Sequence, residues 1–384
     1  MTGQAIPLGQ VAPVPPWAQR IDHVLLGVVL ALMGIGLVMV ASASVDMAAR
    51  ASAKPLAYFW RHGLYLCAAL VAIGVTARVE LSVLRRLSPL LLIGGIVLLA
   101  LVLVPGIGRQ VNGSTRWIGL GPVTLQPSEL VKVFVVLYLS GYLVRRASEV
   151  RETWKGFFKP VAILVLIAGL LLMEPDFGTT VVMFATALGM LLLGGVPLRT
   201  YIAWMAVIGV ALAVILFMAP YRLERLMTFL NPWAHPTDSG YQLIQALIAI
   251  GRGEWLGVGL GASVQKLFYL PEAHTDFLFA VLGEELGCLG ICTVLALFMV
   301  MVWRGFAIAR HAASRGDEFG AHLAHGLTLL LGMQAFVNAG VNLGVLPTKG
   351  LTLPLMSYGG SSLLASGIAV GLLLRIELEA RRVQ

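Results

Sequence analysis

About ten apolar stretches, each long enough to cross roughly 30 Å of hydrocarbon, constrain this chain more than any other feature. They lie near residues 24–43, 58–77, 89–104, 127–144, 160–174, 178–195, 200–219, 277–303, 322–343 and 361–375. With 58% hydrophobic and only 12% charged residues, the chain has too little polar surface for a soluble domain. We therefore predict an all-α polytopic membrane protein of about ten transmembrane helices, with a large outer loop between spans seven and eight.

Three of these stretches, at 89–104, 160–174 and 361–375, are short for a span. We expect them to extend into their flanks or to be irregular at one end. Short spans beside polar motifs often mark a site in membrane proteins.

Two segments lie outside the span pattern. Residues 1–20 are rich in proline and lack an apolar core followed by a small-residue cleavage site, so we expect a disordered cytoplasmic tail rather than a signal peptide. Residues 21–384 are predicted to form a single membrane domain, in which 220–275 is a large periplasmic loop. Within that loop, YQLIQALIAI at 241–250 has the apolar pattern of a short helix lying on the outer leaflet.

The positions of lysine and arginine predict the orientation, because short cytoplasmic loops carry the excess of these residues. The alternate loops beginning with the N-terminus contain Arg20; Arg78, Arg85, Arg86; Arg145, Arg146, Arg151, Lys155, Lys159; Arg199; Arg304, Arg310, Arg315; and Arg375, Arg381, Arg382. Both termini are therefore predicted to be cytoplasmic. The net charge of +8 suits anionic lipid headgroups, and no basic and aromatic stripe indicates a nucleic-acid partner.

The first polar motif on the opposite, outer side is NGSTRWIGLGPVTLQPSELVK at 112–132. Pro127 suits the first turn of the fourth span, and Gln126, Glu129 and Lys132 recur at intervals of three on one helix face. Two interpretations stay open. The Glu129 and Lys132 pair could simply neutralise itself inside the span, or Lys132 and Arg116 could offer positive charge to an anionic headgroup.

The second motif, EPDFGTT at 174–180, joins spans five and six with two carboxylates and Pro175. It could be a plain turn. Alternatively, Glu174 and Asp176 could position basic residues or bind a divalent cation through oxygen ligands, although two carboxylates do not make a complete metal site.

The third motif, PTKGLTLPLMSYGGSS at 347–362, re-enters the membrane region as polar, glycine-rich chain. Non-helical backbone at this depth is tolerated only where it is buried or lines a wet cavity. The motif therefore predicts a cavity on the outer side.

The fourth motif, LPEAHTDFLFAVLGEELG at 270–287, places Asp276 where a polar loop enters the eighth span. An acid in the first turn of a helix can be an ordinary cap for free amide groups. Acids at the membrane border are also candidates for chemistry, and the other motifs on the same side favour that interpretation. Glu284 and Glu285 lie roughly 12 Å farther along the helix, where we expect them to be paired or protonated.

Taken together, LPEAHTDFLFAVLGEELG, QPSELVK, EPDFGTT and LPLMSYGGSS resemble the SEDS family (shape, elongation, division and sporulation) over essentially the whole chain. PTKG at 347–350 is more similar to the division branch than to the rod-elongation branch. The resemblance implies a ten-span peptidoglycan glycosyltransferase that polymerises lipid II on the outer face of the cytoplasmic (inner) membrane, at the division septum. It also implies a class B penicillin-binding protein of the FtsI type as partner, beside other division proteins of the FtsQ, FtsL, FtsB and FtsN types.

The same resemblance assigns the essential acid to Asp276. The residues expected to bind substrate are Arg61, Arg116, Gln126, Glu129, Lys132, Asp176, His274, Thr275, Lys349 and Ser361.

The chemistry of such an enzyme fits these residue types. Asp276 would accept the proton of the acceptor sugar 4-hydroxyl, while Arg61, Arg116 and Lys132 would assist the departing diphosphate. No cofactor is required by the sequence, although a divalent cation, Mg²⁺ or Mn²⁺, could share the work of the basic residues. An ordinary helix-start aspartate is a weak base, so desolvation by substrate is expected to raise its pKa.

A transporter that flips lipid II is the main alternative function. Many spans and a polar cavity would suit it equally. A flippase should, however, carry polar groups toward both leaflets, whereas the four motifs lie on one side. A scaffold without catalysis would leave Asp276 unexplained.

Overall fold

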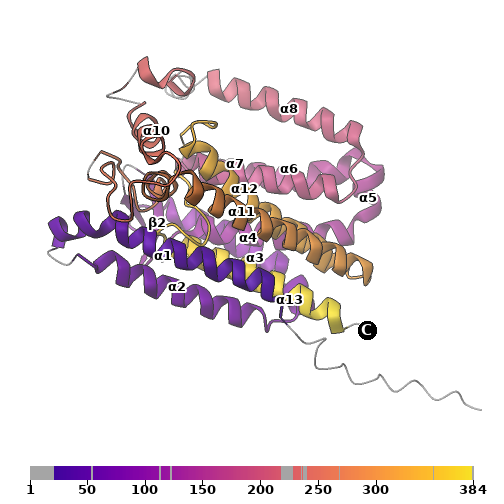
Figure 1. Cartoon of the computed structure of the whole chain (residues 1–384). Coiled ribbons are helices and arrows are strands. Elements are labelled where there is room, and N and C mark those ends of the chain that lie inside the picture. Colours follow the sequence, from indigo (N-terminus) through magenta and orange to yellow (C-terminus); the bar gives the residue numbers. More distant parts are fainter. Residues whose placement is uncertain are drawn as a thin grey trace, which may run out of the picture.

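The structure is a computed structural model that describes residues 21–52, 55–111, 114–121, 123–217, 228–234, 236, 240–267, 269–348 and 350–382. Its helices run roughly alongside one another as a bundle (Figure 1). The predicted tail at 1–20 and part of the predicted outer loop, including 218–227, lie outside the described residues.

Every predicted span coincides with a helix. The helices are α1 (His23–Ser52), α2 (Ala57–Thr76), α3 (Leu81–Val102), α4 (Pro127–Arg145), α6 (Trp154–Met173), α7 (Phe177–Leu193), α8 (Leu198–Phe217), α11 (Leu278–Ser314), α12 (Glu318–Asn342) and α13 (Gly360–Arg382), with a short α5 (Ala147–Glu152) between α4 and α6. Within the described part of the chain, 8 of them are long and apolar enough to span a membrane, and α7 and the apolar part of α8 are shorter. The all-α polytopic prediction is confirmed. The three short stretches extend into their flanks, as expected.

A small β-sheet between α3 and α4 was not predicted. Strands β1 (Gly108–Val111), β2 (Ser114–Leu120) and β3 (Val123–Leu125) pair in the order β1-β2-β3, both pairs antiparallel. Gly121 follows β2 with a φ of +66°, which glycine adopts without steric cost. The sheet matters for the site because β2 carries Arg116.

Helices α4, α12 and α13 form the centre of the bundle. In their apolar windows 78%, 72% and 83% of the residues are buried, against 22% for α3 and 28% for α2. Glycine on α13 allows α2 to approach closely, since a Cβ added at Gly367 would lie 2.7 Å from the Ala69 carbonyl oxygen. Small residues at such contacts favour tight packing of membrane helices.

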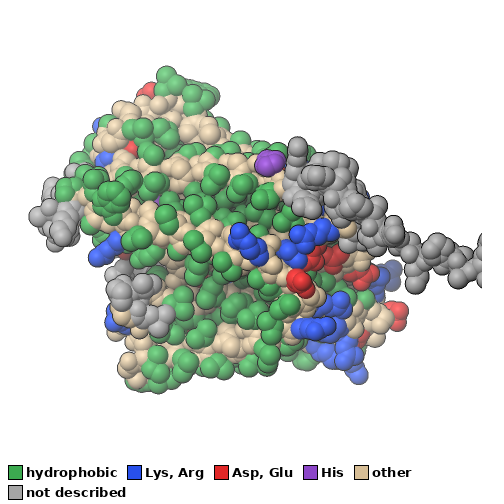
Figure 2. Space-filling model, turned by 90° about the horizontal axis from the view of Figure 1, so that it is seen from below, with side chains coloured by type: hydrophobic (Ala, Val, Ile, Leu, Met, Phe, Trp, Pro, Cys, Tyr) green, Lys and Arg blue, Asp and Glu red, His purple; other side chains and the backbone are tan. Residues whose placement is uncertain are grey.

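The two ends of the bundle differ in character. The beginning of α1 and the end of α13 lie at the same end (Figure 1), which agrees with termini on one side of the membrane. Lys and Arg gather there beside acidic residues (Figure 2). Arg304 pairs with Asp22, and Arg381 pairs with Glu377. The loops carrying the polar motifs lie at the opposite end, which we call the outer end.

Helix α11 is broken near its outer end. Gly287 has a non-helical φ of 66° and ψ of −163°. The chain after α10 (Tyr241–Gly253) fills the break with backbone hydrogen bonds: the amides of Val258 and Gly259 donate to the carbonyls of Glu284 and Glu285 over 3.0 and 3.1 Å. The predicted helix at 241–250 is thus present, and its loop is joined to α11.

Glu284 and Glu285 are both paired, as expected. The Glu284 carboxylate accepts from Arg252 Nη1 at 3.1 Å, and Glu285 accepts from Lys266 Nζ at 2.8 Å and from Ser42. Both acids are buried. Pairing of this kind is what makes a buried carboxylate tolerable.

Candidate active site

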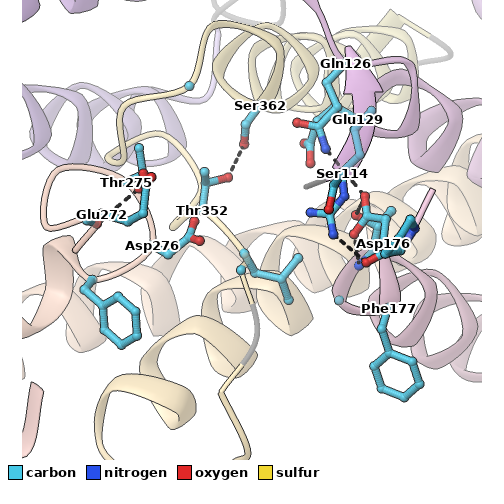
Figure 3. Close-up of a pocket in the computed structure, with 18 of the residues that line it drawn as sticks. Ser114, Gln126, Glu129, Asp176, Phe177, Glu272, Thr275, Asp276, Thr352 and Ser362 are labelled. Carbon is cyan, nitrogen blue, oxygen red and sulfur yellow. Dashed lines mark hydrogen bonds between the residues drawn. The ribbon is translucent and has the colours of Figure 1, made fainter. Parts of the chain in front are cut away.

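A cavity of about 750 Å³ opens among the loops and helix beginnings of the outer end. Figure 3 shows two groups of polar side chains facing one another across it, one around Asp276 and the other around Asp176. The lining residues are Ser114, Arg116, Trp117, Gln126, Glu129, Pro175, Asp176, Phe177, Gly178, Thr179, Tyr241, Gln242, Pro271, Glu272, Thr275, Asp276, Phe277, Thr348, Gly350, Leu351, Thr352, Tyr358, Gly359, Ser361 and Ser362. The four motifs of the sequence therefore meet in one place.

Seven of the residues that the sequence assigns to the site line the cavity: Arg116, Gln126, Glu129, Asp176, Thr275, Asp276 and Ser361. Three others do not line it. Lys132 is buried below it, His274 packs behind its wall, and Arg61 is exposed on α2, where it hydrogen-bonds Tyr358. Lys349 lies outside the described residues.

Asp276 precedes α11 without capping it. The N-cap position is Phe277, and the first turn of α11 contains no acidic residue. The carbonyl oxygen of Asp276 accepts hydrogen bonds from Asn338 Nδ2 at 2.9 Å and Asn342 Nδ2 at 3.1 Å. Its side chain faces the cavity beside Gly350. Asp276 is therefore not a simple helix cap.

The surroundings of Asp276 make it a better base than an ordinary aspartate. Asp276 is half-buried in the cavity wall, and desolvation is the largest of the effects that together raise its pKa from 3.8 to about 7. The neighbouring Glu272 contributes to this rise, while Arg116 opposes it. We expected substrate to supply this desolvation, but the protein already supplies it without substrate.

Asp176 has a structural role on the opposite side of the cavity. It is the N-cap of α7, where its carboxylate accepts from the Thr179 amide at 3.2 Å and the Thr179 hydroxyl at 2.9 Å. It also accepts from Ser128 Oγ at 3.2 Å. Asp176 thus joins the beginnings of α4 and α7.

Arg116 extends from β2 to the turn between α6 and α7. Its Nε donates to the Glu174 carbonyl at 3.0 Å, and Nη2 donates to the Pro175 carbonyl. The Glu174 carboxylate is fully buried, and neither of its oxygens has a hydrogen-bond partner within the described residues. Burial, with a contribution from Asp176, raises its pKa to about 8, although Arg116 acts against the shift. Glu174 is therefore mostly neutral at pH 7.

Lys132 and Glu129 form the pair considered from the sequence. Lys132 Nζ donates to Glu129 Oε1 at 2.9 Å and to Gln334 Oε1 at 2.7 Å. Lys132 is 2% exposed and does not reach the main cavity. The two side chains therefore neutralise each other, and of the two only Glu129 faces the main cavity.

Sequence reasoning missed several lining residues. Glu272 accepts from Thr275 Oγ1 at 2.8 Å, and Thr352 Oγ1 donates to Ser362 Oγ at 2.7 Å (Figure 3). The Tyr358 amide donates to the His274 carbonyl at 3.0 Å, and the two rings lie 5.4 Å apart. All of these residues lie within the four polar motifs of the sequence. The signal that could have identified them is their position beside the residues already assigned to the site.

The charge of the cavity is predominantly acidic. Its described lining includes Glu129, Asp176, Glu272 and Asp276 against the single cation Arg116. In the same part of the chain, no three His, Cys, Asp or Glu side chains come together as a metal-binding group. The residues present therefore do not form a ready-made metal site.

Comparison with known proteins identifies the class of this fold and site. The family model described as cell cycle protein, FtsW/RodA/SpoVE, matches residues 22–382. The chain belongs to this family, which confirms the resemblance drawn from the four motifs. Within the family it is of the FtsW type.

Two curated relatives show how close the match is. The protein of Nitrosococcus halophilus is 58% identical over 360 residues, covering 94% of this chain and 93% of its own length. The protein of Alkalilimnicola ehrlichii is 54% identical over 368 residues, covering 94% of this chain and 90% of its own length. Each is named probable peptidoglycan glycosyltransferase FtsW.

Two solved structures share the fold. One is a chain of a peptidoglycan synthase complex that coordinates polymerisation and crosslinking, with a TM-score of 0.78 and 29% identity over 94% of this chain and 98% of the other. The second is the rod shape determining protein RodA of Thermus thermophilus, with a TM-score of 0.68 and 29% identity over the same shares. The chain is therefore a multi-pass membrane protein of this fold.

Proposed function

We propose that this protein is a peptidoglycan glycosyltransferase that polymerises lipid II on the outer face of the cytoplasmic membrane during cell division. The observation that carries the proposal is Asp276, a carboxylate that caps no helix, faces a cavity at the outer end and has a pKa raised to about 7. The names of the close relatives support the same activity.

In the proposed reaction, Asp276 removes the proton from the 4-hydroxyl of the acceptor sugar. The oxygen forms a bond to the anomeric carbon of the donor as the bond from that carbon to the diphosphate breaks, so an α-linked phosphate becomes a β-linked sugar. A positioned general base typically contributes about 10²–10⁴-fold to the rate. The departing diphosphate takes the bonding electrons, and Arg116 is the described cavity residue that can meet its charge.

The acidic lining gives a reason to propose a divalent cation as well. Glu129 is paired with Lys132, but the carboxylates of Asp176, Glu272 and Asp276 also line the cavity, so a diphosphate entering there needs more positive charge than the Arg116 guanidinium supplies. Because no ready-made metal group exists in the described residues, Mg²⁺ or Mn²⁺ would have to take some of its ligands from the diphosphate itself. The steps above do not depend on this ion.

The flippase alternative is less well supported by the geometry. A second space beside Lys132 and Gln334 is lined mainly by apolar side chains, and its volume is only about 10 Å³. That is about enough for one water molecule and far too small for a lipid headgroup. The cavity in which the four motifs meet lies at the outer end, which supports a polymerase.

The proposal includes the setting of the enzyme. By analogy with the solved synthase complex, we propose a class B penicillin-binding protein of the FtsI type as partner. Divisome proteins of the FtsQ, FtsL, FtsB and FtsN types, a septal location and cytoplasmic termini belong to the same proposal. The clustering of Lys and Arg at the end of the bundle that holds both described chain ends supports the orientation (Figure 2).

The experiment is polymerisation of labelled lipid II by the purified protein with its transpeptidase partner. Asp276→Asn keeps the size of the side chain and removes the base, so glycan ladders should disappear while folding is retained. Asp317→Asn is the matched control, because Asp317 also precedes a helix but accepts from the Gly320 amide at the other end of the bundle. Normal ladders from Asp276→Asn, free of other polymerases, would refute the base assignment.

A further inference from the structure

Helix α12 carries three buried amide side chains at intervals of four residues, Gln334, Asn338 and Asn342. They are 3%, 2% and 0% exposed. This spacing puts them on one helix face, about 6 Å apart along the axis. Polar side chains within a membrane span are costly and tend to be functional, so what these amides bind is informative.

The two asparagines hold the backbone on which the catalytic acid stands. Asn338 Nδ2 and Asn342 Nδ2 both donate to the Asp276 carbonyl, at 2.9 and 3.1 Å. Asn342 Oδ1 accepts from the Ala280 amide at 3.1 Å, in the first turn of α11. Asp276 is therefore anchored on its carbonyl side, while its carboxylate remains directed toward the cavity.

The same face of α12 also binds residues 351–352, which lie across from Asp276. Asn338 Nδ2 also donates to the Leu351 carbonyl, and Gln334 Nε2 donates to the Thr352 carbonyl at 3.1 Å. Gln334 Oε1 meanwhile accepts from Lys132 Nζ at 2.7 Å. One row of amides thus contacts three separate segments of the site: the Asp276 turn, residues 351–352 and α4.

We propose that Gln334, Asn338 and Asn342 act as positioning residues that set the gap between Asp276 and residues 350–352. This gap is narrow, since a Cβ added at Gly350 would lie 2.8 Å from Asp276 Oδ2. Misplacing a catalytic group by about 1 Å can reduce a rate about 100-fold. The inference rests on the proposed function, because it takes Asp276 as the base.

The test uses Asn338→Leu and Asn342→Leu in the full chain with its transpeptidase partner. Leucine keeps similar volume and removes both donor and acceptor. We expect kcat for labelled lipid II to fall by about 100-fold, KM to change less than about three-fold, and the acid limb of the pH profile to move as the acid shifts in its pocket. These readouts separate positioning from packing, which would change the melting temperature without changing them.

Thr328→Val is the matched control. Thr328 is buried on the same helix, but its hydroxyl donates to the Ala324 carbonyl of α12 itself at 2.7 Å. This variant should keep wild-type kcat and pH profile. Should the leucine variants not accumulate, Asn342→Ser provides the same comparison, because the shorter side chain keeps polarity but cannot span to Asp276.

The outcomes distinguish the two proposals. Wild-type kcat and pH profile in folded Asn338→Leu and Asn342→Leu proteins would overturn the positioning role, and so would a change confined to KM or to thermal stability. Asp276→Asn in the same assay reports on the proposed function alone. An active Asp276→Asn protein refutes the base, whereas an inactive one beside fully active asparagine variants refutes only the positioning role.

Discussion

Polymerisation should weaken on the acid side of neutrality, because burial and the nearby Glu272 raise the pKa of Asp276 to about 7. An acid with this pKa is about 90% ionised at pH 8 and about 10% ionised at pH 6. Since only the carboxylate can accept the proton, kcat/KM should fall about ten-fold between these two values. An aspartate with the ordinary pKa of 3.8 would stay ionised and give a flat profile over this range.

The assay is the initial rate of glycan formation at lipid II concentrations below KM, measured from about pH 5.5 to 8.5. Glu272→Gln removes a negative charge that raises the pKa of Asp276, so its acid limb should move to lower pH. Glu254→Gln is the matched control, because Glu254 is exposed in the same outer loop. A flat wild-type profile, or an acid limb that Glu272→Gln leaves in place, would refute the reasoning.

Arg116→Ala should raise KM for lipid II about ten-fold or more with a smaller change in kcat, since a charge that lines the cavity is lost; unchanged lipid II binding would argue against this role. Lys132→Met should instead lower thermal stability, because breaking a buried pair leaves Glu129 unpaired at a cost of about 3–5 kcal/mol; a variant with wild-type melting temperature and impaired binding would contradict this expectation. Asp276→Asn should melt at a higher temperature than the wild type at pH 8. The pKa of Asp276 is higher in the folded than in the unfolded chain, so the folded state loses stability as pH rises from about 4 to 7. Asparagine removes this loss. An equal difference in melting temperature between variant and wild type at pH 4 and pH 8 would show that ionisation of Asp276 is not its cause.

The spans could be predicted from the sequence because each helix must supply its own apolar length, and this length is a local property. The same holds for the polar motifs, whose residues interrupt the apolar pattern and could be recognised one segment at a time. Arg116, Glu129 and Asp276, which line the cavity, can therefore be recognised from the sequence alone.

What each polar residue binds could not be predicted in this way. The sequence leaves two interpretations of Lys132, a pair with Glu129 or a contact to the diphosphate. Its second hydrogen bond, to Gln334 at 202 positions along the chain, is predicted by neither. The hydropathy pattern does not distinguish Asn338 and Asn342, because two amides barely lower the hydropathy of a span; only their spacing of four residues indicates a shared helix face. The strands around Arg116 were missed because STRWIGL is short and alternates only weakly.

The break at Gly287 changes which solvent surrounds Glu284 and Glu285. At 1.5 Å per residue the inner part of α11, residues 288–314, is about 40 Å long, which is enough to cross the bilayer without the outer part. Residues 278–286 can therefore belong to a protein cap that stands on the membrane, enclosed by α10 and the chain that follows it. A hydropathy profile merges the two parts into one span and so overstates the free-energy cost of placing Glu284 and Glu285 there. Both carboxylates are surrounded by Arg252, Lys266 and backbone amides rather than by lipid.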